Sequence, residues 1–307
     1  MPEDTKVAVL EMGISTPGEM VRLAQLVRPH TVTITNICAT HLEFLGTKEA
    51  VAREKLSLLE HAAVNAPLVI NADDPLLVRE ASRFRDNPIT FGINNPADVT
   101  PQSMQPGDGG AASVRIQGRE FRLPLFGSYQ VYNLLAAFAT VRALGYDFDG
   151  VDTAAIELST APMRGEVLSV NGALFVLDCY NANPESVISG LRSFDSFPHT
   201  GRRIAVLGDM LELGAETEQY HREVGEALAA STVDLAVLVG PLARFIREEA
   251  VASGLAASRA RYFGTAADCA ARVGDIVQPG DLVYLKGSRG IGLEAVLEAW
   301  QATEENT

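Results

Sequence analysis

Strand-like apolar runs alternate with helix-like segments along most of the 307 residues, which restricts the chain to a small set of folds. Residues 6–11 are predicted to form a buried strand, followed by a helix that Thr16 caps and that extends to residue 27. Further strands are predicted at residues 31–37 and 68–70. Because strands separated by helices pair in parallel, with helices on both faces of the sheet, the sequence predicts an α/β protein.

Two regions of this alternation follow one another. The first ends with a β-hairpin around Gly118 and a helix over residues 131–144. In the second region, strands are predicted at residues 173–177, 204–207, 235–239 and 282–285. Residues 158–163 interrupt both patterns, so we expect two domains, residues 1–160 and residues 161–307.

Composition argues against several kinds of partner. The 25 basic and 39 acidic side chains give a net charge of −14, which repels nucleic acids and anionic membranes over most of the surface. No apolar run is long enough to span a membrane, and the first residues lack the pattern of a signal peptide. The three dispersed cysteines, Cys38, Cys179 and Cys269, are too few for a disulfide framework, so we expect a cytoplasmic protein.

Polar side chains follow the first three predicted strands. Glu11 follows the first, His41 comes shortly after the second, and Asn71, Asp73 and Asp74 follow the third. The carboxyl ends of parallel strands meet at one edge of a sheet, where ligands collect. Carboxylates and an imidazole at this edge suit a divalent cation, with Mg²⁺ favoured over Zn²⁺ because oxygen ligands dominate. The alternative is that these side chains only solvate the loop ends.

Lys55 lies on the apolar stripe of a helix that Thr47 is predicted to cap. It comes four residues after Val51 and three before Leu58, so it is predicted to point inward. A buried ammonium group is costly unless it is paired or chemically altered. The alternative is that its stem lies along the apolar surface while the amine reaches water.

A turn over residues 286–292 joins the last strand to a final helix and contains Lys286 and Arg289. Backbone N–H groups at the start of a helix, flanked by two cations, form a natural anion or carboxylate site. The glycines of this turn do not follow the G-x-G-x-x-G spacing of dinucleotide loops. The loop at Asp209 is comparable, although it could be a plain turn.

Several segments, each weakly informative alone, occur in an order that is highly specific. They are Glu11-Met12-Gly13, Ile34-Thr35-Asn36-Ile37, His41-Leu42-Glu43, Lys55, Asn71-Ala72-Asp73-Asp74, Gly127 with Asn133-Leu134-Leu135, Met163-Arg164, Asp178-Cys179-Tyr180-Asn181, Gly208-Asp209-Met210-Leu211-Glu212-Leu213-Gly214 and Lys286-Gly287-Ser288-Arg289. Together they resemble the ATP-dependent Mur ligases, most closely the type that adds D-alanyl-D-alanine to the UDP-muramoyl-tripeptide of peptidoglycan synthesis. The resemblance spans nearly the whole chain.

The resemblance implies a fold and a set of roles. The fold would be a truncated P-loop-type central domain followed by a Rossmann-like, doubly wound C-terminal domain. Glu11 and His41 would hold Mg²⁺ at the ATP γ-phosphate, and Lys55 would be carbamylated into an anionic metal ligand with a catalytic role. The remaining implied contacts are Asn133 with adenine, Arg164 with the reacting phosphates, Asp178 and Tyr180 with the nucleotide, and Asp209, Lys286, Ser288 and Arg289 with the amino-acid substrate.

Departures from the family pattern leave three functions open. No G-x-x-x-x-G-K-[ST] phosphate loop and no N-terminal UDP-substrate domain occur in these residues, and Tyr129 and Gln130 replace an expected His-Asn pair. We expect a truncated ligase with little activity alone. The alternatives are a non-catalytic nucleotide or amino-acid binding protein, paired with a subunit that supplies the phosphate loop, and a related ligase with another substrate.

Overall fold

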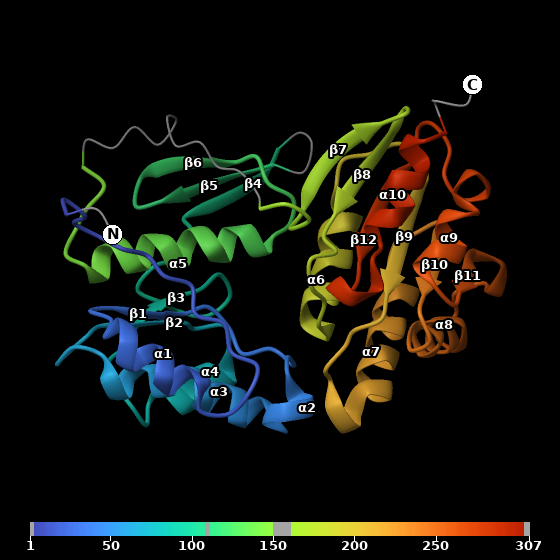
Figure 1. Ribbon diagram of the computed structural model, residues 1–307. Helices are drawn as coiled ribbons and strands as arrows, with labels where there is room; N and C mark the ends of the chain where they lie inside the picture. Colours follow the sequence, from blue (N-terminus) through green and yellow to red (C-terminus); the bar gives the residue numbers. More distant parts are fainter. Residues whose placement is uncertain (1–2, 108–110, 150–160, 304–307) are drawn as a thin grey trace.

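The computed structural model describes residues 3–107, 111–149 and 161–303. They form an N-terminal part, up to residue 149, and a C-terminal part, from residue 161, which lie side by side (Figure 1). Strands and helices alternate in both parts and the strands of the two main sheets are mostly parallel, which confirms the predicted α/β class. Residues 158–160 of the predicted boundary at residues 158–163 lie outside the described residues.

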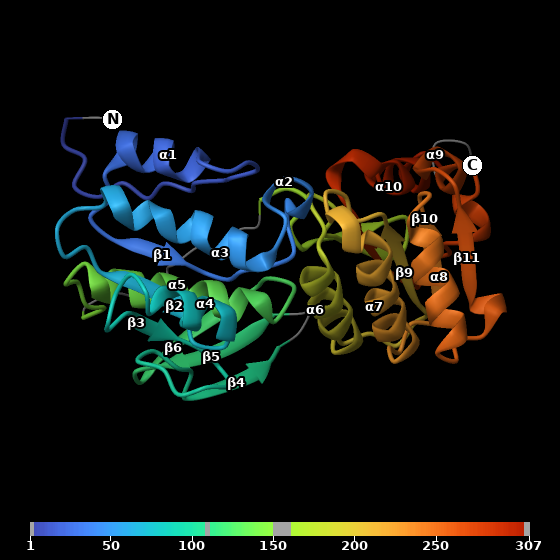
Figure 2. The ribbon, with the colours of Figure 1, turned by 90° about the horizontal axis from the view of Figure 1, so that it is seen from below.

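The N-terminal part is built on a small parallel sheet with the strand order β1-β2-β3. Its elements are β1 (Val32–Ile34), β2 (Leu68–Asn71), β3 (Ile89–Phe91), α1 (Glu19–Val27), α2 (Leu42–Leu45), α3 (Lys48–Leu56), the 3-10 helix η1 (Ser57–His61) and α4 (Pro75–Ala81). Figure 2 shows α1 and α3 on one face of this sheet and α5 (Tyr129–Ala143) on the other.

Helix α5 lies between the parallel sheet and a second, antiparallel sheet (Figure 1). The strands of the second sheet are β4 (Ser103–Pro106), β5 (Ala112–Ile116) and β6 (Arg119–Leu123). Gln117 and Gly118 join β5 to β6 with φ angles of 48° and 77°, and two successive positive φ angles are typical of a tight hairpin turn. The predicted hairpin is therefore confirmed.

The prediction of a buried strand at residues 6–11 is wrong. These residues form no strand, and Val9 is 90% exposed. A strand needs a neighbour to accept and donate its backbone hydrogen bonds, whereas β1 pairs only with β2 among the described residues. The apolar composition of the segment predicted burial, but no described element covers it.

Helix α1 begins later than predicted. Gly18, with a φ of 83°, precedes the helix, so Thr16 is not its cap. The Glu19 carboxylate instead accepts hydrogen bonds from the backbone N–H groups of Ser15 (2.6 Å) and Thr16 (2.9 Å). The glycine turns the chain, and the carboxylate of the first helical residue satisfies two backbone donors of the loop that precedes the helix.

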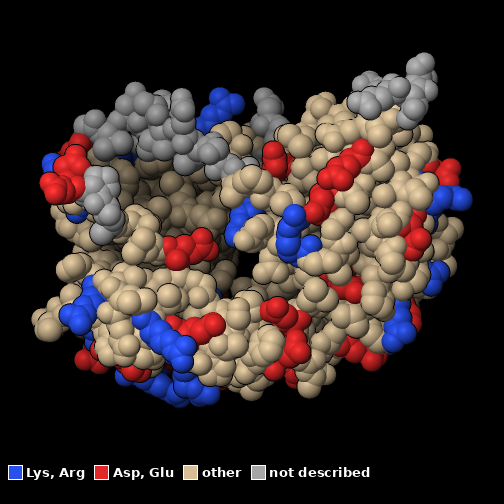
Figure 3. Space-filling view, viewed as in Figure 1, with Lys and Arg blue, Asp and Glu red and all other residues tan. Residues whose placement is uncertain are grey.

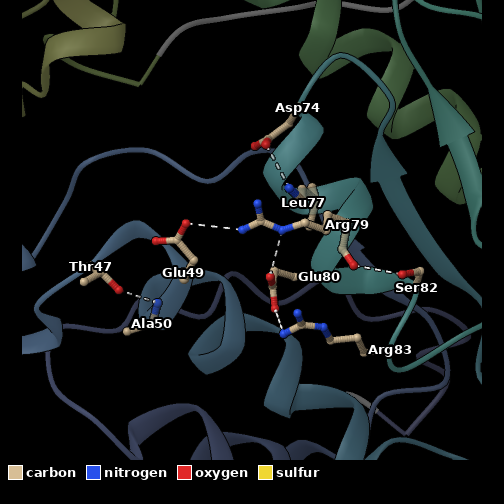
Figure 4. A network of polar contacts seen from close by, with 9 residues as sticks. All are labelled: Thr47, Glu49, Ala50, Asp74, Leu77, Arg79, Glu80, Ser82 and Arg83. Atoms are coloured by element: carbon tan, nitrogen blue, oxygen red, sulfur yellow. Dashed lines mark hydrogen bonds and ion pairs between the residues drawn. The ribbon is translucent and has the colours of Figure 1, made fainter.

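An arginine–carboxylate network joins α3 to α4 (Figure 4). Glu80 is only 1% exposed and accepts from Arg79 (3.1 Å) and Arg83 (2.6 Å). Arg79 also reaches Glu49 on α3 at 3.2 Å. A buried carboxylate is stable when charged donors compensate it, and Arg79 extends this network to α3, the helix that carries Lys55.

The C-terminal part is a six-stranded sheet with the order β11-β10-β9-β12-β8-β7, in which only β7 is antiparallel to its neighbour. Its strands are β7 (Glu166–Val170), β8 (Ala173–Leu177), β9 (Arg203–Gly208), β10 (Leu235–Val239), β11 (Ala260–Phe263) and β12 (Leu282–Lys286). Its α-helices are α6 (Pro184–Asp195), α7 (Thr217–Ala229), α8 (Ala243–Ala252), α9 (Ala266–Ala270) and α10 (Glu294–Gln301). Its 3-10 helices are η4 (Gly214–Glu216), η5 (Ala257–Arg259), η6 (Val273–Asp275) and η7 (Arg289–Ile291). Buried side chains fill both faces of the sheet.

Charged side chains of both signs are scattered over the face seen in Figure 3, with no single basic field. None of the helices in the described ranges is both long enough and apolar enough to cross a bilayer.

Gly225 allows α7 to pack closely against α8. A Cβ atom at Gly225 would lie 2.6 Å from the Ile246 carbonyl oxygen, and backbone atoms cannot move aside cheaply. We expect Gly225→Ala to lower the free energy of unfolding by about 1–3 kcal/mol, although alanine normally favours a helix. Urea denaturation measures the loss. Gly274→Ala, where the added atom meets open space, is the matched control, and equal stability of the two variants would contradict the close packing.

Candidate functional site

The predicted ligand-binding residues of the C-terminal part gather at the carboxyl ends of three neighbouring strands. The chain runs from β8 to β9, outward through β10 and β11, and returns to β12 between β8 and β9. Such a reversal of strand order opens a crevice at the carboxyl edge of a sheet, where ligands of α/β proteins bind. The residues at or next to this edge are Arg164, Asp178, Tyr180, Asp209, Lys286, Ser288 and Arg289.

A buried ion pair joins the end of β8 to the end of β12. The Lys286 Nζ atom lies 3.0 Å from Asp178 Oδ2 and donates to the carbonyl oxygens of Asp178 (3.1 Å) and Asn181 (2.9 Å). Tyr284 also donates to Asp178 Oδ2 at 3.2 Å. Burial raises the pKa of Asp178, and the Lys286 charge opposes this shift. Because Lys286 uses its donors within the chain, a substrate contact would require it to exchange these partners.

Arg164 and Tyr180 form a stacked pair beside this ion pair. The guanidinium carbon lies 4.2 Å from the centroid of the Tyr180 ring, which favours a cation–π contact. Both side chains are exposed, and no described residue accepts a hydrogen bond from the guanidinium group. An arginine with free donors at the edge of a crevice is suited to phosphate oxygens.

Asp209 and Ser288 are buried, and their contacts are structural. Asp209 Oδ1 accepts from the backbone N–H groups of Leu242 (3.0 Å) and Ala243 (2.6 Å) at the start of α8. Burial raises its pKa, and these two hydrogen bonds counteract the rise. The Ser288 hydroxyl accepts a hydrogen bond from the Leu211 N–H at 2.9 Å, and the backbone N–H of Ser288 donates to the Asp209 carbonyl oxygen at 3.0 Å. The two residues therefore hold adjacent loops together, and Asp209 is only 1% exposed.

Arg289 is the accessible cation of the final turn. It is exposed, pairs with Glu294, and lies 3.3 Å from the sulfur of Met163. An exposed guanidinium group can exchange a side-chain carboxylate for that of a ligand with little loss of solvation. Arg289 therefore fits the predicted carboxylate contact better than the buried Lys286.

The three predicted metal ligands make separate contacts in this structure. His41 Nδ1 lies 2.5 Å from Glu212 Oε2, and Glu11 is exposed, with no hydrogen bond to any residue in the described ranges. Lys55 Nζ donates to the Asn36 carbonyl at 3.0 Å. The described residues contain no group of three His, Cys, Asp or Glu side chains placed to hold a metal ion. Metal binding by Glu11, His41 and Lys55 stays a prediction.

The surroundings of Lys55 favour its neutral amine. Burial lowers the pKa of Lys55, while the charge of the nearby Asp74 carboxylate opposes this shift. The nearby Cys38 is in an environment that raises its thiol pKa to about 12 by burial, so it remains protonated and supplies no counter-charge near neutral pH. A neutral amine is the form that reacts with carbon dioxide, so this environment is compatible with the predicted carbamylation.

Asn133 lies on α5, in the N-terminal part. Its side chain is exposed and donates to the Gln130 side chain at 3.0 Å, one helical turn earlier. The amide is therefore accessible to a ligand. Its predicted contact with adenine stays a prediction.

Two carboxylates of the C-terminal part that the sequence did not single out bind the N-terminal part. Glu185, in the first turn of α6, accepts from Lys48 Nζ (2.6 Å) and from the Ala39 N–H (3.2 Å). Glu212 pairs with His41, and its carbonyl oxygen accepts from the Glu43 N–H at 3.1 Å. Both contacts join residues far apart in the chain, and no local pattern identifies such partners.

Asp73, a candidate metal ligand from the sequence, is the centre of a structural network. Its carboxylate accepts from the backbone N–H groups of Ile93 (2.7 Å), Asn94 (2.9 Å) and Asn95 (2.7 Å) and from the Tyr132 hydroxyl (2.8 Å). Burial tends to raise its pKa, but these hydrogen bonds outweigh burial and hold it below the ordinary value. Asp73 therefore fixes the loop after β3 onto α5.

Two family profiles match nearly the whole chain: Mur ligase middle domain over residues 1–141, and Mur ligase, glutamate ligase domain over residues 163–289. The chain is 31% identical to the UDP-N-acetylmuramoyl-tripeptide–D-alanyl-D-alanine ligase of Bacillus subtilis over 97% of its residues, and spans 65% of that protein's length. It is also similar to the crystal structure of MurF ligase from Thermotoga maritima in complex with ADP (TM-score 0.80, 29% identity, 95% of this chain and 66% of that chain). MurF from Acinetobacter baumannii is similar as well (TM-score 0.84, 25% identity, 95% of this chain and 64% of that chain).

The Asp73 network predicts a pH-dependent contribution to stability. Because the folded-state pKa is lowered, the contribution is present above about pH 4 and is lost as the pH falls through the folded-state pKa. We expect Asp73→Ala to lower the free energy of unfolding by about 2 kcal/mol at pH 7, and this deficit to shrink between about pH 4 and pH 2. Denaturant unfolding at several pH values measures it. The exposed Asp86→Ala is the control, and a deficit that does not change with pH would contradict this role.

Proposed function

This chain belongs to the Mur ligase family, and we propose that it binds ATP and D-alanyl-D-alanine as part of a ligase that extends the UDP-muramoyl-tripeptide of peptidoglycan synthesis. The observation that carries the proposal is the gathering of Arg164 with Tyr180, the Asp178–Lys286 pair, and Arg289 at one edge of the C-terminal sheet. Similarity to MurF ligases, including one in complex with ADP, supports the choice of nucleotide and dipeptide. The dispersed cysteines are consistent with a cytoplasmic reaction.

In the proposed reaction the tripeptide carboxylate takes the γ-phosphoryl group of ATP and releases ADP. The dipeptide amine then attacks the resulting acyl phosphate, and the tetrahedral intermediate releases phosphate and a proton as the amide bond forms. The exposed guanidinium group of Arg164 would bind the transferring phosphate and neutralise its charge. Arg289 would hold the dipeptide carboxylate and so orient the amine toward the acyl carbon. Enclosure between the two parts of the molecule would keep water from the acyl phosphate.

Mg²⁺ would supply charge neutralisation at the phosphates, and only some of the residues assigned to it fit that role here. Lys55 has the partly buried, pKa-lowered amine that carbamylation requires. Glu11 and His41 are not assembled with it, since His41 pairs with Glu212 and Glu11 is exposed. We therefore propose Lys55 as the residue to test for carbamylation.

The separate contacts of Glu11, His41 and Lys55 favour a second candidate function. In this alternative the chain binds nucleotide or amino acid without catalysis, and a partner chain supplies the phosphate loop. Titration calorimetry with Mg·ATP and with D-alanyl-D-alanine measures the binding that this alternative requires, and a phosphate-release assay with and without a candidate partner measures whether catalysis accompanies it.

A polypeptide of these 307 residues should not turn over as a ligase. The β- and γ-phosphates would lack the backbone cradle and lysine of a phosphate loop, so we expect no phosphate release from ATP, UDP-muramoyl-tripeptide and D-alanyl-D-alanine. A phosphate-release assay measures this, with the Bacillus subtilis ligase as the positive control. Steady release that depends on both ATP and the dipeptide would show that the chain is catalytically complete.

The dipeptide assignment predicts a specific loss at Arg289. Removing a charged hydrogen-bond donor from a ligand carboxylate should weaken the binding of D-alanyl-D-alanine by about tenfold or more in Arg289→Ala. Arg272→Ala is the matched control because Arg272 is also exposed and pairs with a nearby carboxylate, Asp275. Calorimetry gives both affinities. Equal affinities in the two variants would remove Arg289 from the dipeptide site.

A further inference from the structure

Residues 126–129, the seam segment, run from the loop after β6 (Arg119–Leu123) to the first residue of α5 (Tyr129–Ala143) and contact the C-terminal part. Phe126 is only 1% exposed, and its ring centroid lies 5.6 Å from that of Tyr284 and 6.1 Å from that of Phe197. The backbone N–H of Ser128 donates to the Ser193 hydroxyl at 3.1 Å. The N-terminal end of α5 is therefore anchored to the C-terminal part.

Two glycines leave room for Tyr129, the first residue of α5. A Cβ atom at Gly127 would lie 2.2 Å from the Tyr129 ring, and one at Gly165 would lie 2.6 Å from its hydroxyl. Gly127 belongs to the seam segment, whereas Gly165 immediately precedes β7 in the C-terminal part. The phenol ring thus spans the junction of the two parts, at a place where a side chain on either glycine would displace it.

The Tyr129 hydroxyl is buried, and no residue in the described ranges forms a hydrogen bond with it. Burial raises the pKa of Tyr129, and the nearby charge of Asp178 adds to this effect, so the hydroxyl remains a donor. Asp178 offers an acceptor on the other side of the junction. Lys286 and Tyr284 contact its Oδ2 atom, whereas no described residue donates to Oδ1.

An unpaired donor and an unused acceptor on opposite sides of a junction suggest a second arrangement in which they meet. A buried hydroxyl without a partner is costly, so a rearrangement that pairs it with a carboxylate is favourable. Asn133, the proposed adenine contact, lies four residues after Tyr129 and therefore on the same face of α5. Arg164, the proposed phosphate contact, lies beside Gly165. A nucleotide held by Asn133 and Arg164 would bridge the two parts next to Tyr129.

We infer that Tyr129 is a positioning residue that couples nucleotide binding to the arrangement of the two parts, through a hydrogen bond from its hydroxyl to Asp178 Oδ1 in the nucleotide-bound state. This inference rests on the proposed nucleotide site. In the arrangement of this structure the hydroxyl is unpaired among the described residues. With nucleotide the bond adds to the affinity.

The test compares the 307-residue chain with Tyr129→Phe and with Tyr146→Phe, which removes a hydroxyl from a tyrosine that is 55% exposed. Calorimetry gives the affinity of each protein for Mg·ADP, and thermal unfolding without nucleotide gives its midpoint temperature of unfolding. We expect Tyr129→Phe to bind Mg·ADP about tenfold more weakly while its midpoint is unchanged or raised, since an unpaired group is removed. We expect Tyr146→Phe to change neither quantity.

Two results would overturn the inference while leaving the proposed function intact. One is a Tyr129→Phe affinity within twofold of the unmodified chain, and the other is a lowered midpoint without nucleotide, which would mean that the hydroxyl is already bonded. If the Tyr129 hydroxyl only filled space, its removal would not weaken the binding of Mg·ADP while leaving the unfolding midpoint unchanged or raised. An unmodified chain that does not bind Mg·ADP would reject the proposed nucleotide site, and the inference with it.

Discussion

The buried ion pair between Asp178 and Lys286 holds together the crevice in which the other candidate residues lie. Lys286 is 4% exposed and ties β12 both to the carboxylate after β8 and to the carbonyl oxygen of Asn181. Removing one partner of such a pair costs about 3–5 kcal/mol, because the remaining charge is left buried and uncompensated. The pair therefore fixes the loop that contains Tyr180, and Tyr180 in turn supports Arg164. The position of the exposed Arg164 guanidinium group therefore depends on the buried Lys286.

Contacts between the two parts of the molecule divide into an apolar anchor and several polar pairs. Phe126 is buried among aromatic rings of the C-terminal part, whereas the Lys48–Glu185 and His41–Glu212 pairs are partly exposed. Exposed ion pairs contribute little net stability, and apolar burial contributes more. The anchor at Phe126 thus holds the parts together, while the polar pairs can exchange partners at small cost. Such a junction permits adjustment around the neighbouring Tyr129.

Local signals predicted much of the fold. The strands at residues 173–177 and 235–239 have the predicted bounds, and Asn183 caps α6 after a clear Asn-Pro start signal. These features depend on periodicity and capping within a few residues. Residues 7–10 of the segment at residues 6–11 are also apolar, but burial of a strand requires a neighbouring strand, and the segment itself does not encode one. The antiparallel β7 was missed because most of its side chains are only partly buried, which weakens its apolar pattern.

The position of the candidate site followed from topology, but the state of each side chain did not. Parallel strands bring their carboxyl ends together whatever the loops contain, so Asp178, Lys286 and Arg289 could be placed at one edge from the sequence. Lys286 ends β12 and Arg289, three residues later, begins η7; both carry the same charge, yet one is buried with its donors in use and the other is exposed. Both residues are cations and both lie close to the end of β12, so neither their charge nor their place in the sequence distinguishes them. Only the burial of each side chain in the folded protein determines which cation can bind a ligand and which one supports the crevice.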